Sequence, residues 1–344
     1  MRGRCQDERM PSRRPLPPEL GRVFSVRAAL DAGVTPGRLR DGGLDRPFHG
    51  VRSRPFPAPG APQATEPSAY DVQAQALRAA ARAYAPRMLP RQFISHRSAA
   101  AMWHAPMPLL RVDDDEGKIV GAADMPLDVS TFGDGHLPRL KGVKAHRARA
   151  RTSRVVQLDG VQVSDAATTW ASLGGTLSLI DTVALGDFFC REWTPGAGRP
   201  NVGMRPIATV DDLQRATDAG RRVGVRRLRE ALSLIRTGSW SPRESAVRCH
   251  IVFAGLPEPE LNVDVFTAEG HFLGCVDLAY PELKIAIEYQ SVLHASRYSQ
   301  DVERIAALRA AGWEVIEVTA TLLADPDAMV ARIRRAIARR RATL

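Results

Sequence analysis

Two acidic residues, Asp277 and Glu288, are the first candidates for chemistry in this sequence. They lie within residues 271 to 290, where two apolar runs alternate with period two on either side of Pro281. This pattern is typical of two antiparallel strands joined by a turn. With residues 281 to 284 as the loop, the register that follows places Asp277 directly opposite Glu288.

The same register sorts the hairpin into an apolar face and a polar face. Opposed side chains on one face have Cβ atoms about 5 Å apart, and two carboxylates at that distance repel unless a cation lies between them. Oxygen ligands completed by water are what Mg²⁺ prefers, so a site for Mg²⁺ or Mn²⁺ is predicted. The apolar face is predicted to carry Val276, Leu278, Ile285, Ile287 and Tyr289, and the polar face Asp277, Glu288 and Gln290 with Cys275, Ala279 and Ala286.

The spacing of Asp277, Glu288 and Gln290 resembles the D…(E)xK signature of the PD-(D/E)XK nuclease superfamily. The surrounding sequence is similar to actinobacterial proteins related to very-short-patch-repair endonucleases, and the similarity is strong over residues 240 to 340. It is carried by SPRESAVRCHIVFAGLPEPELNVDVF, GCVDLAYPELKIAIEYQSVLH and RIAALRAAGWEVIEVTA. The resemblance implies that Asp277 and Glu288 hold the catalytic metal.

Gln290 stands where this family has Asp and where the wider superfamily has Lys, while His294 is in the expected place. Glutamine can orient a water, but its neutral amide cannot neutralise a phosphate. The resemblance therefore implies that Gln290 orients the attacking water. It also implies that His294 donates a proton to the leaving oxygen or contacts the DNA backbone.

The elements predicted from residue 240 to 344 are a helix, three strands, a helix, a strand and a final helix. This αβββαβα order is that of the nuclease superfamily. Ser241 and Pro242 are helix-start signals, and they place Glu244 in the first turn of the first helix. The resemblance implies that Glu244 completes the metal site, although an acid there also favours the helix dipole with no catalytic role.

A second element with candidate nucleic-acid contacts covers residues 18 to 54. Ser25 and Thr35 are predicted helix caps, and the second helix would present Arg38 and Arg40 before a short basic strand. The arrangement resembles the winged helix-turn-helix of AbiEi-type antitoxins, which implies DNA binding. A helical hairpin that only packs against the rest of the chain is the alternative.

The remaining parts of the chain divide where the composition changes. In the last part before the nuclease-like domain, Arg226 and Arg227 are candidate phosphate contacts on a helix that could equally be a connecting strut. We interpret Met10 as an alternative to Met1 for the start of the protein. The predicted parts are a disordered leader over residues 1 to 17, a Pro/Ala-rich linker over 55 to 67, a mixed α/β middle domain over 68 to 200, and a basic helical connector over 201 to 239.

The 344-residue chain has a net charge of +10 and a pI of about 10.1, which favours a polyanionic partner such as DNA. Residues 1 to 60 carry 12 arginines against 6 acids, and residues 137 to 154 carry seven Lys or Arg and no acid. Residues 241 to 330 carry 6 basic and 14 acidic side chains. DNA affinity is therefore expected mostly outside the nuclease-like domain.

Cysteine and histidine spacing gives no sign of a zinc site. The four cysteines form no CxxC pair, which also argues against a disulfide framework and fits a reducing cytosol. His96 and His104 have no acid or cysteine at ligand spacing, so we interpret both as solvated or hydrogen-bonded histidines. No run of about 18 apolar residues occurs, so no membrane partner is expected.

These observations favour a cytoplasmic, mixed α/β, DNA-binding protein whose C-terminal domain is a divalent-metal-dependent endonuclease. The alternative is an antitoxin-type transcriptional regulator with a catalytically inactive nuclease fold, for which a toxin encoded nearby is a candidate partner. Gln290 favours the regulator, while retention of Asp277 and Glu288 favours the enzyme.

Overall fold

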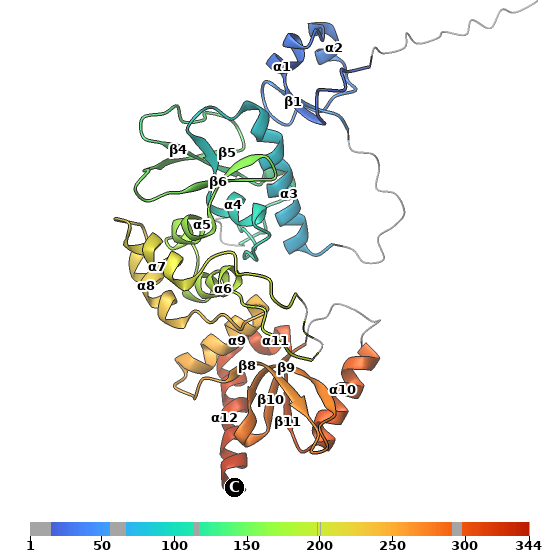
Figure 1. Cartoon of the computed structure of the whole chain (residues 1–344), viewed down its shortest axis with the longest axis vertical. Helices are drawn as coiled ribbons and strands as arrows, with labels where there is room; N and C mark the ends of the chain where they lie inside the picture. Colours follow the sequence, from blue (N-terminus) through green and yellow to red (C-terminus); the bar gives the residue numbers. More distant parts are fainter. Residues whose placement is uncertain are drawn as a thin grey trace, which may run out of the picture.

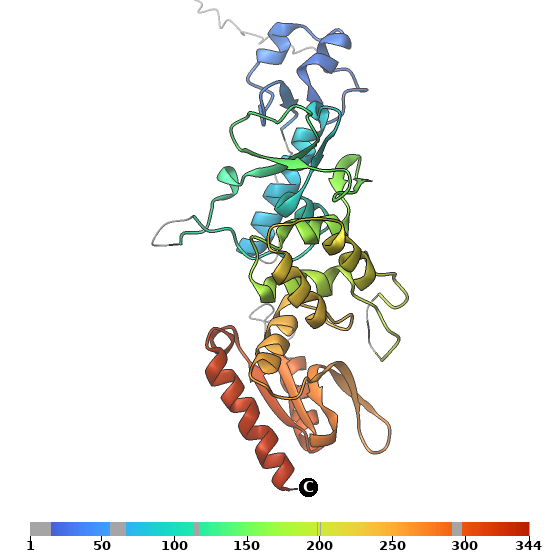
Figure 2. The same ribbon diagram turned by 90° about the vertical axis from the view of Figure 1, so that its left-hand side faces the viewer.

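The computed structural model describes residues 15–55, 67–112, 117–197, 199, 201–290 and 298–343. The protein is mixed α/β, and its elements form successive groups along the long axis of the molecule (Figure 1). The view turned by 90° shows the same order (Figure 2). The described strands form separate sheets of two, five and four strands. No described helix is long and apolar enough to cross a membrane.

The N-terminal group is a pair of short helices held by a two-stranded antiparallel sheet. Both predicted helix caps are confirmed, because the Ser25 hydroxyl accepts from the Ala28 N–H and the Thr35 hydroxyl accepts from the Arg38 N–H. The predicted basic strand is also present. The elements are β1 (Val23–Ser25), α1 (Val26–Asp31), α2 (Pro36–Arg40) and β2 (Val51–Ser53).

The next group is a five-stranded sheet with the order β5-β4-β3-β7-β6, covered by α3 and α4. The shortest strand, β3, has three residues, which are too few to show an alternating pattern in the sequence. The basic strand β5 lies at the sheet edge. The elements are α3 (Ala69–Tyr84), η1 (Ala85–Arg87), β3 (Gln92–Ile94), α4 (His96–Met102), η2 (Ala122–Asp124), β4 (Leu127–Phe132), β5 (Val143–Ala148), β6 (Val155–Leu158) and β7 (Val161–Ser164).

Helix α3 contacts both the N-terminal group and the start of the C-terminal domain. At its C-terminal end, the Tyr84 ring meets Phe48 of the N-terminal group edge-on, with 5.5 Å between the ring centroids. At its N-terminal end, the Tyr70 hydroxyl accepts a hydrogen bond of 3.1 Å from Arg243. Arg243 lies in the first turn of the helix that begins the C-terminal domain, so one helix touches both neighbouring parts.

Two serines that precede helices, Ser95 and Ser164, do not cap them. Ser95 precedes α4, but its hydroxyl accepts no helix N–H. Ser164 ends β7, and the cap of the following helix is Asp165, whose carboxylate accepts from the Thr168 N–H at 2.7 Å. A carboxylate and a hydroxyl in adjacent positions are both good caps, and local sequence does not decide between them.

Four helices form the third group around Trp170, Leu185, Phe189, Leu213 and Leu228. This single core crosses the boundary that the sequence analysis placed between residues 200 and 201. The predicted connector is therefore packed against the preceding helices. The elements are α5 (Ala166–Leu173), α6 (Leu179–Phe189), α7 (Val210–Asp218) and α8 (Val225–Leu234).

The C-terminal domain has the predicted element order with one extra short helix, α11. Its four-stranded sheet has the order β11-β10-β9-β8, in which only the β10–β11 pair is parallel. The elements are α9 (Pro242–Phe253), β8 (Glu260–Phe266), β9 (Phe272–Tyr280), η3 (Pro281–Leu283), β10 (Ile285–Tyr289), α10 (Tyr298–Ala310), β11 (Glu314–Val318), α11 (Ala320–Leu323) and α12 (Pro326–Ala342).

Both faces of this sheet are covered by helices (Figure 1). Helices α9 and α12 pack on the face that carries Leu278 and Ile287, and α10 packs on the other face. Val276 was predicted beside Leu278, but it packs in the cluster on the α10 side. In the neighbouring strand β8, Asn262 has a left-handed φ of 50°, and the pairing with β9 shifts between Val265 and Phe266.

A buried ion pair joins the helical group to the C-terminal domain. Arg248 of α9 donates to the Asp187 carboxylate of α6 at 3.0 Å, and both side chains are at most 1% exposed. Arg248 also donates to Glu258 at 3.0 Å, and the Ser245 hydroxyl donates to Asp187 at 2.7 Å. The paired charges satisfy each other away from water, so α6 and α9 are fixed relative to one another.

Removing one member of this pair should destabilise the protein strongly. We expect Arg248→Ala to lower the free energy of unfolding by about 3–5 kcal/mol, because the Asp187 charge is left buried without its partner. The matched control is Arg82→Ala, which breaks a surface pair with Asp159 whose members are 48% and 55% exposed. That change should cost about 1 kcal/mol or less. Urea denaturation checks both values, and equal losses would contradict the prediction.

Candidate functional site

The predicted hairpin register is confirmed. Ile285 pairs with Tyr280, and Ile287 pairs with Leu278. The paired residues end there, so Asp277 and Glu288 lie immediately beyond the last pair of β9 and β10. The Asp277 carboxylate accepts a hydrogen bond of 2.8 Å from the backbone N–H of Tyr289, which fixes it beside the end of β10.

Glu244 of α9 is held toward the same region. It lies in the first turn of α9, where Ser241 caps the helix, as predicted. Its carboxylate accepts from the Trp240 N–H at 2.8 Å and from the Asn262 side-chain amide at 3.0 Å. Glu244 is 5% exposed and makes these two bonds with one oxygen, Oε2.

The three carboxyl groups interact electrostatically. Burial, followed by the charges of Glu288 and Glu244, raises the pKa of Asp277 well above its usual value. Burial also raises the pKa of Glu288 and of Glu244. The charge of Glu244 is also among the causes that raise the pKa of Glu288, so a nearby positive charge would favour the ionised forms of these acids. Their oxygen donors fit a hard divalent ion.

Arg304 of α10 supplies one positive charge to this cluster, and the sequence analysis did not find it. Its guanidinium donates to both oxygens of Glu288, at 2.6 and 3.3 Å. Helical spacing is the sequence signal that could have found Arg304. It lies four residues before Leu308, which is fully buried against the sheet, so both side chains are on the same side of α10. Arg304 therefore competes with any cation that would use Glu288.

The other predicted catalytic residues contribute less to the described geometry. The backbone N–H of Gln290 donates to the Val318 carbonyl at 2.9 Å, and this residue is half-buried two positions after Glu288. His294 lies outside the described residues, so no position is assigned to it.

The predicted DNA contacts on α2 lie at the surface of the N-terminal group. Arg40 is exposed, and Arg38 is half-buried. The Arg38 guanidinium lies 3.4 Å from Asp41. Arg40 is therefore the more accessible of the two for a phosphate contact.

The two predicted phosphate contacts on α8 differ in exposure. Arg226 is exposed, whereas Arg227 is half-buried and donates to the carbonyls of Gly174 at 3.0 Å and Leu177 at 2.5 Å. These bonds attach α8 to the turn between α5 and α6. Arg227 thus stabilises the helical group, and Arg226 remains available to a ligand.

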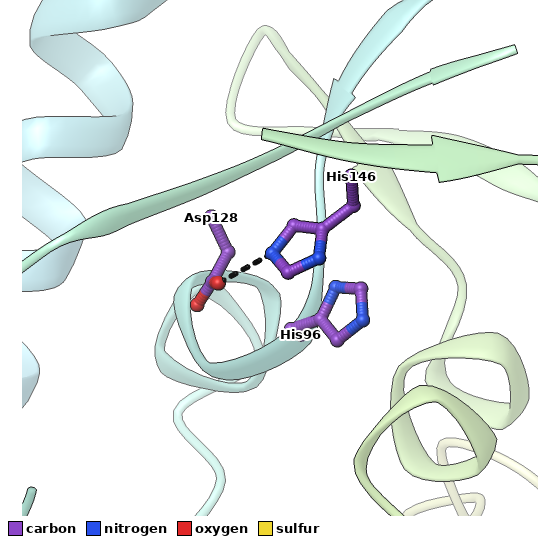
Figure 3. A group of neighbouring side chains, drawn as sticks. All are labelled: His96, Asp128 and His146. Atoms are coloured by element: carbon purple, nitrogen blue, oxygen red, sulfur yellow. Dashed lines mark hydrogen bonds and ion pairs between the residues drawn. The ribbon is translucent and has the colours of Figure 1, made fainter. Parts of the chain in front are cut away.

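A second cluster lies in the five-stranded sheet, where His96, Asp128 and His146 come together (Figure 3). They are contributed by α4, β4 and β5. Their nearest ligand atoms all lie within 4.8 Å of one another, and among the described residues this is the group of His, Cys and acidic side chains that could hold a metal by this measure. The sequence analysis found no acid for His96, because Asp128 and His146 reach it only through the pairing of β4 with β5.

The His96 imidazole is neutral at physiological pH. Burial and the neighbouring His146 lower its pKa to about 4, and Asp128 opposes this only in part. Lys144 and Arg222 also lower it. His104, the other histidine considered in the sequence, is exposed and stands apart from this cluster.

Comparison with known proteins finds distant relatives of this chain. The chain is 32% identical over 130 residues to two uncharacterized proteins of Mycobacterium tuberculosis, one from strain CDC 1551 / Oshkosh and one from strain ATCC 25618 / H37Rv. Each match covers 37% of this chain and 47% of the relative, so the chain spans about half the length of the relatives it matches. No protein-family profile and no solved structure matches the chain.

The lowered pKa of His96 predicts a pH dependence of stability. Between pH 6.5 and about 4, His96 is protonated in the unfolded chain but stays neutral in the folded protein. The free energy of unfolding should therefore fall as the pH is lowered through this window. The contribution is about 3 kcal/mol at most, since each tenfold change in proton affinity is worth about 1.4 kcal/mol.

The control for this prediction is His96→Asn, because asparagine tolerates the left-handed φ of 49° at this position and does not titrate. Urea denaturation of both proteins between pH 4 and 8, with a chelator present, measures the difference. The variant should lose less stability than the wild type on acidification, and parallel curves would rule out His96 as the source.

Proposed function

We propose that this chain is a DNA-binding protein whose C-terminal part is a PD-(D/E)XK-type, divalent-metal-dependent phosphodiesterase. The observation that carries the proposal is the electrostatic interaction of Asp277 on β9 with Glu288 on β10 and Glu244 on α9. The αβββαβα element order supports it, since this is the order of the nuclease superfamily.

The proposed ligands of Mg²⁺ or Mn²⁺ are Asp277 and Glu288, with Glu244 as a third. The fit rests on the chemistry of the donors, because Glu288 and Glu244 raise the pKa of Asp277, and a cation would offset this repulsion. Such an ion lowers the pKa of a bound water and stabilises negative charge on a phosphodiester. In this proposal Gln290 orients the water for in-line attack, and His294 donates a proton to the leaving oxygen or contacts the backbone.

The second candidate is an antitoxin-type transcriptional regulator in which the nuclease fold no longer cleaves. Two observations favour it. Gln290 brings no positive charge to the scissile phosphate, and Arg304 already neutralises Glu288 at 2.6 Å without a metal. In that case the winged-helix-like N-terminal group would bind DNA, and a toxin encoded nearby would be the protein partner.

A DNA contact at the N-terminal group is part of both proposals. Residues 1 to 60 carry 12 arginines against 6 acids, whereas residues 241 to 330 carry 6 basic and 14 acidic side chains. A phosphate backbone is attracted to the first segment and repelled by the second. The exposed Arg40 on α2 is a suitable probe of this contact.

Plasmid nicking separates the two candidates. Losing one electrostatic contact to the reacting phosphate costs about 10²-fold or more in rate, so the wild type should nick supercoiled DNA slowly with Mg²⁺ or Mn²⁺. Gln290→Lys should raise the rate, and Glu288→Ala should abolish it in either background. The control is Glu282→Ala, which removes an exposed acid in the same hairpin and should leave the rate unchanged.

The regulator is favoured by the opposite result. If neither the wild type nor Gln290→Lys nicks the plasmid while the protein still binds duplex DNA, the enzyme proposal is wrong and the regulator remains.

Duplex binding at several salt concentrations tests the N-terminal contact. Arg40→Ala should weaken binding and reduce the slope of log affinity against log salt by about 1, which is the signature of one lost phosphate contact. Arg215→Ala removes the same charge from α7, where the side chain is paired with Asp212, and should change neither quantity much. Identical slopes for the wild type and Arg40→Ala would place the DNA surface elsewhere.

A further inference from the structure

The His96, Asp128 and His146 cluster lies in the five-stranded sheet group, away from the carboxylates of the C-terminal domain (Figure 1, Figure 3). We propose that these three side chains form a binding site for a transition-metal ion of the zinc class. Two imidazole nitrogens and one carboxylate oxygen are the ligands that Zn²⁺ accepts, whereas Mg²⁺ prefers oxygen alone. The inference concerns a different ion and a different site from the proposed nuclease centre.

The positions of the three side chains are close to those of ligands around one metal ion. His146 Nε2 lies 2.7 Å from Asp128 Oδ1, and the His96 and His146 rings are stacked with 3.9 Å between their centroids. All three ligand atoms fall within 4.8 Å of one another. Three protein ligands leave a fourth tetrahedral position, which water or another ligand would fill.

A hydrogen-bonded shell orients the ligands. The Ser95 hydroxyl lies 3.0 Å from His96 Nδ1, and the Ser130 hydroxyl donates to Ser95 at 2.8 Å. A partner on one ring nitrogen fixes the imidazole and leaves the other nitrogen for the metal, as is usual for metal-binding histidines. Asp128 is 5% exposed, so its carboxylate has lost most of its hydration. A bound cation would stabilise the negative charge in place of water.

Two changes accompany binding. The proton shared by Asp128 and His146 must leave, because their 2.7 Å contact is a hydrogen bond. One imidazole must also rotate out of the stack, which differs from parallel by 20°, so that both nitrogen lone pairs converge on one point. Both changes are confined to side chains.

The positive side chains near His96 oppose a cation. Lys144 and Arg222 both disfavour an added positive charge there. They lower the affinity for metal and would instead attract an anion such as phosphate. The experiment must therefore include inorganic phosphate as the competing ligand.

The site would give the sheet a cross-link. His146 lies on β5, the edge strand that pairs only with β4 in the described sheet. A metal held jointly with Asp128 of β4 and His96 of α4 would attach this edge to the helix beneath it. Metal binding should consequently raise the thermal stability of the folded chain.

The test uses the full chain, stripped with a chelator and carrying no histidine tag. Zn²⁺ is titrated by calorimetry in excess Mg²⁺, which occupies the proposed hairpin site, and Co²⁺ absorption reports the ligand set. The wild type and Glu288→Ala should each bind one ion and show a raised melting temperature. His146→Ala and Asp128→Asn should bind at least about tenfold more weakly, while His104→Ala, which removes an exposed histidine, should match the wild type.

Asp128→Asn keeps a hydrogen-bond partner for His146, so it separates loss of a ligand from loss of the fold. Circular dichroism confirms that each variant is folded. Wild-type Zn²⁺ affinity in both Asp128→Asn and His146→Ala would overturn the proposal. Stabilisation by inorganic phosphate together with no response to Zn²⁺ or Co²⁺ would also overturn it, and would identify the cluster as an anion site.

Discussion

The buried contact between Arg248 and Asp187 is the interaction on which the geometry of the C-terminal half depends. Helix α9 is packed on two sides, with Cys249 in the core of the helical group and Val247 in the core of the C-terminal sheet. The ion pair sets the position of the helix between these two cores. Because Glu244 lies one turn earlier on the same helix, its placement near Asp277 follows from that packing.

The acidic cluster is buried at a cost in stability. Glu288 is buried and Asp277 has a strongly raised pKa, so the cluster depends on Arg304 and on backbone donors such as the Tyr289 N–H. Arg304 compensates the charge of Glu288, and a metal at the proposed site would have to compensate the same charge. In that proposal the balance between these two partners, more than the fold itself, would distinguish an enzyme from an inactive relative of one.

Local sequence signals predicted the parts of the site that depend on neighbouring residues. The hairpin register and the caps at Ser25, Thr35 and Ser241 are confirmed, because turns and caps are specified within a few residues. The contacts that were missed join distant segments, as between Arg304 and Glu288. The cluster around His96 was missed for the same reason, since strand pairing across a sheet leaves no fixed spacing in the sequence.

Helix α3 acts as a spacer between the N-terminal group and the start of α9. Its 16 residues span about 24 Å at 1.5 Å per residue, with Tyr84 against the N-terminal group and Tyr70 against Arg243. The distance between these two contacts is therefore set by the covalent geometry of one helix. One residue inserted into α3 would lengthen that distance by about 1.5 Å and turn one contact relative to the other by about 100°.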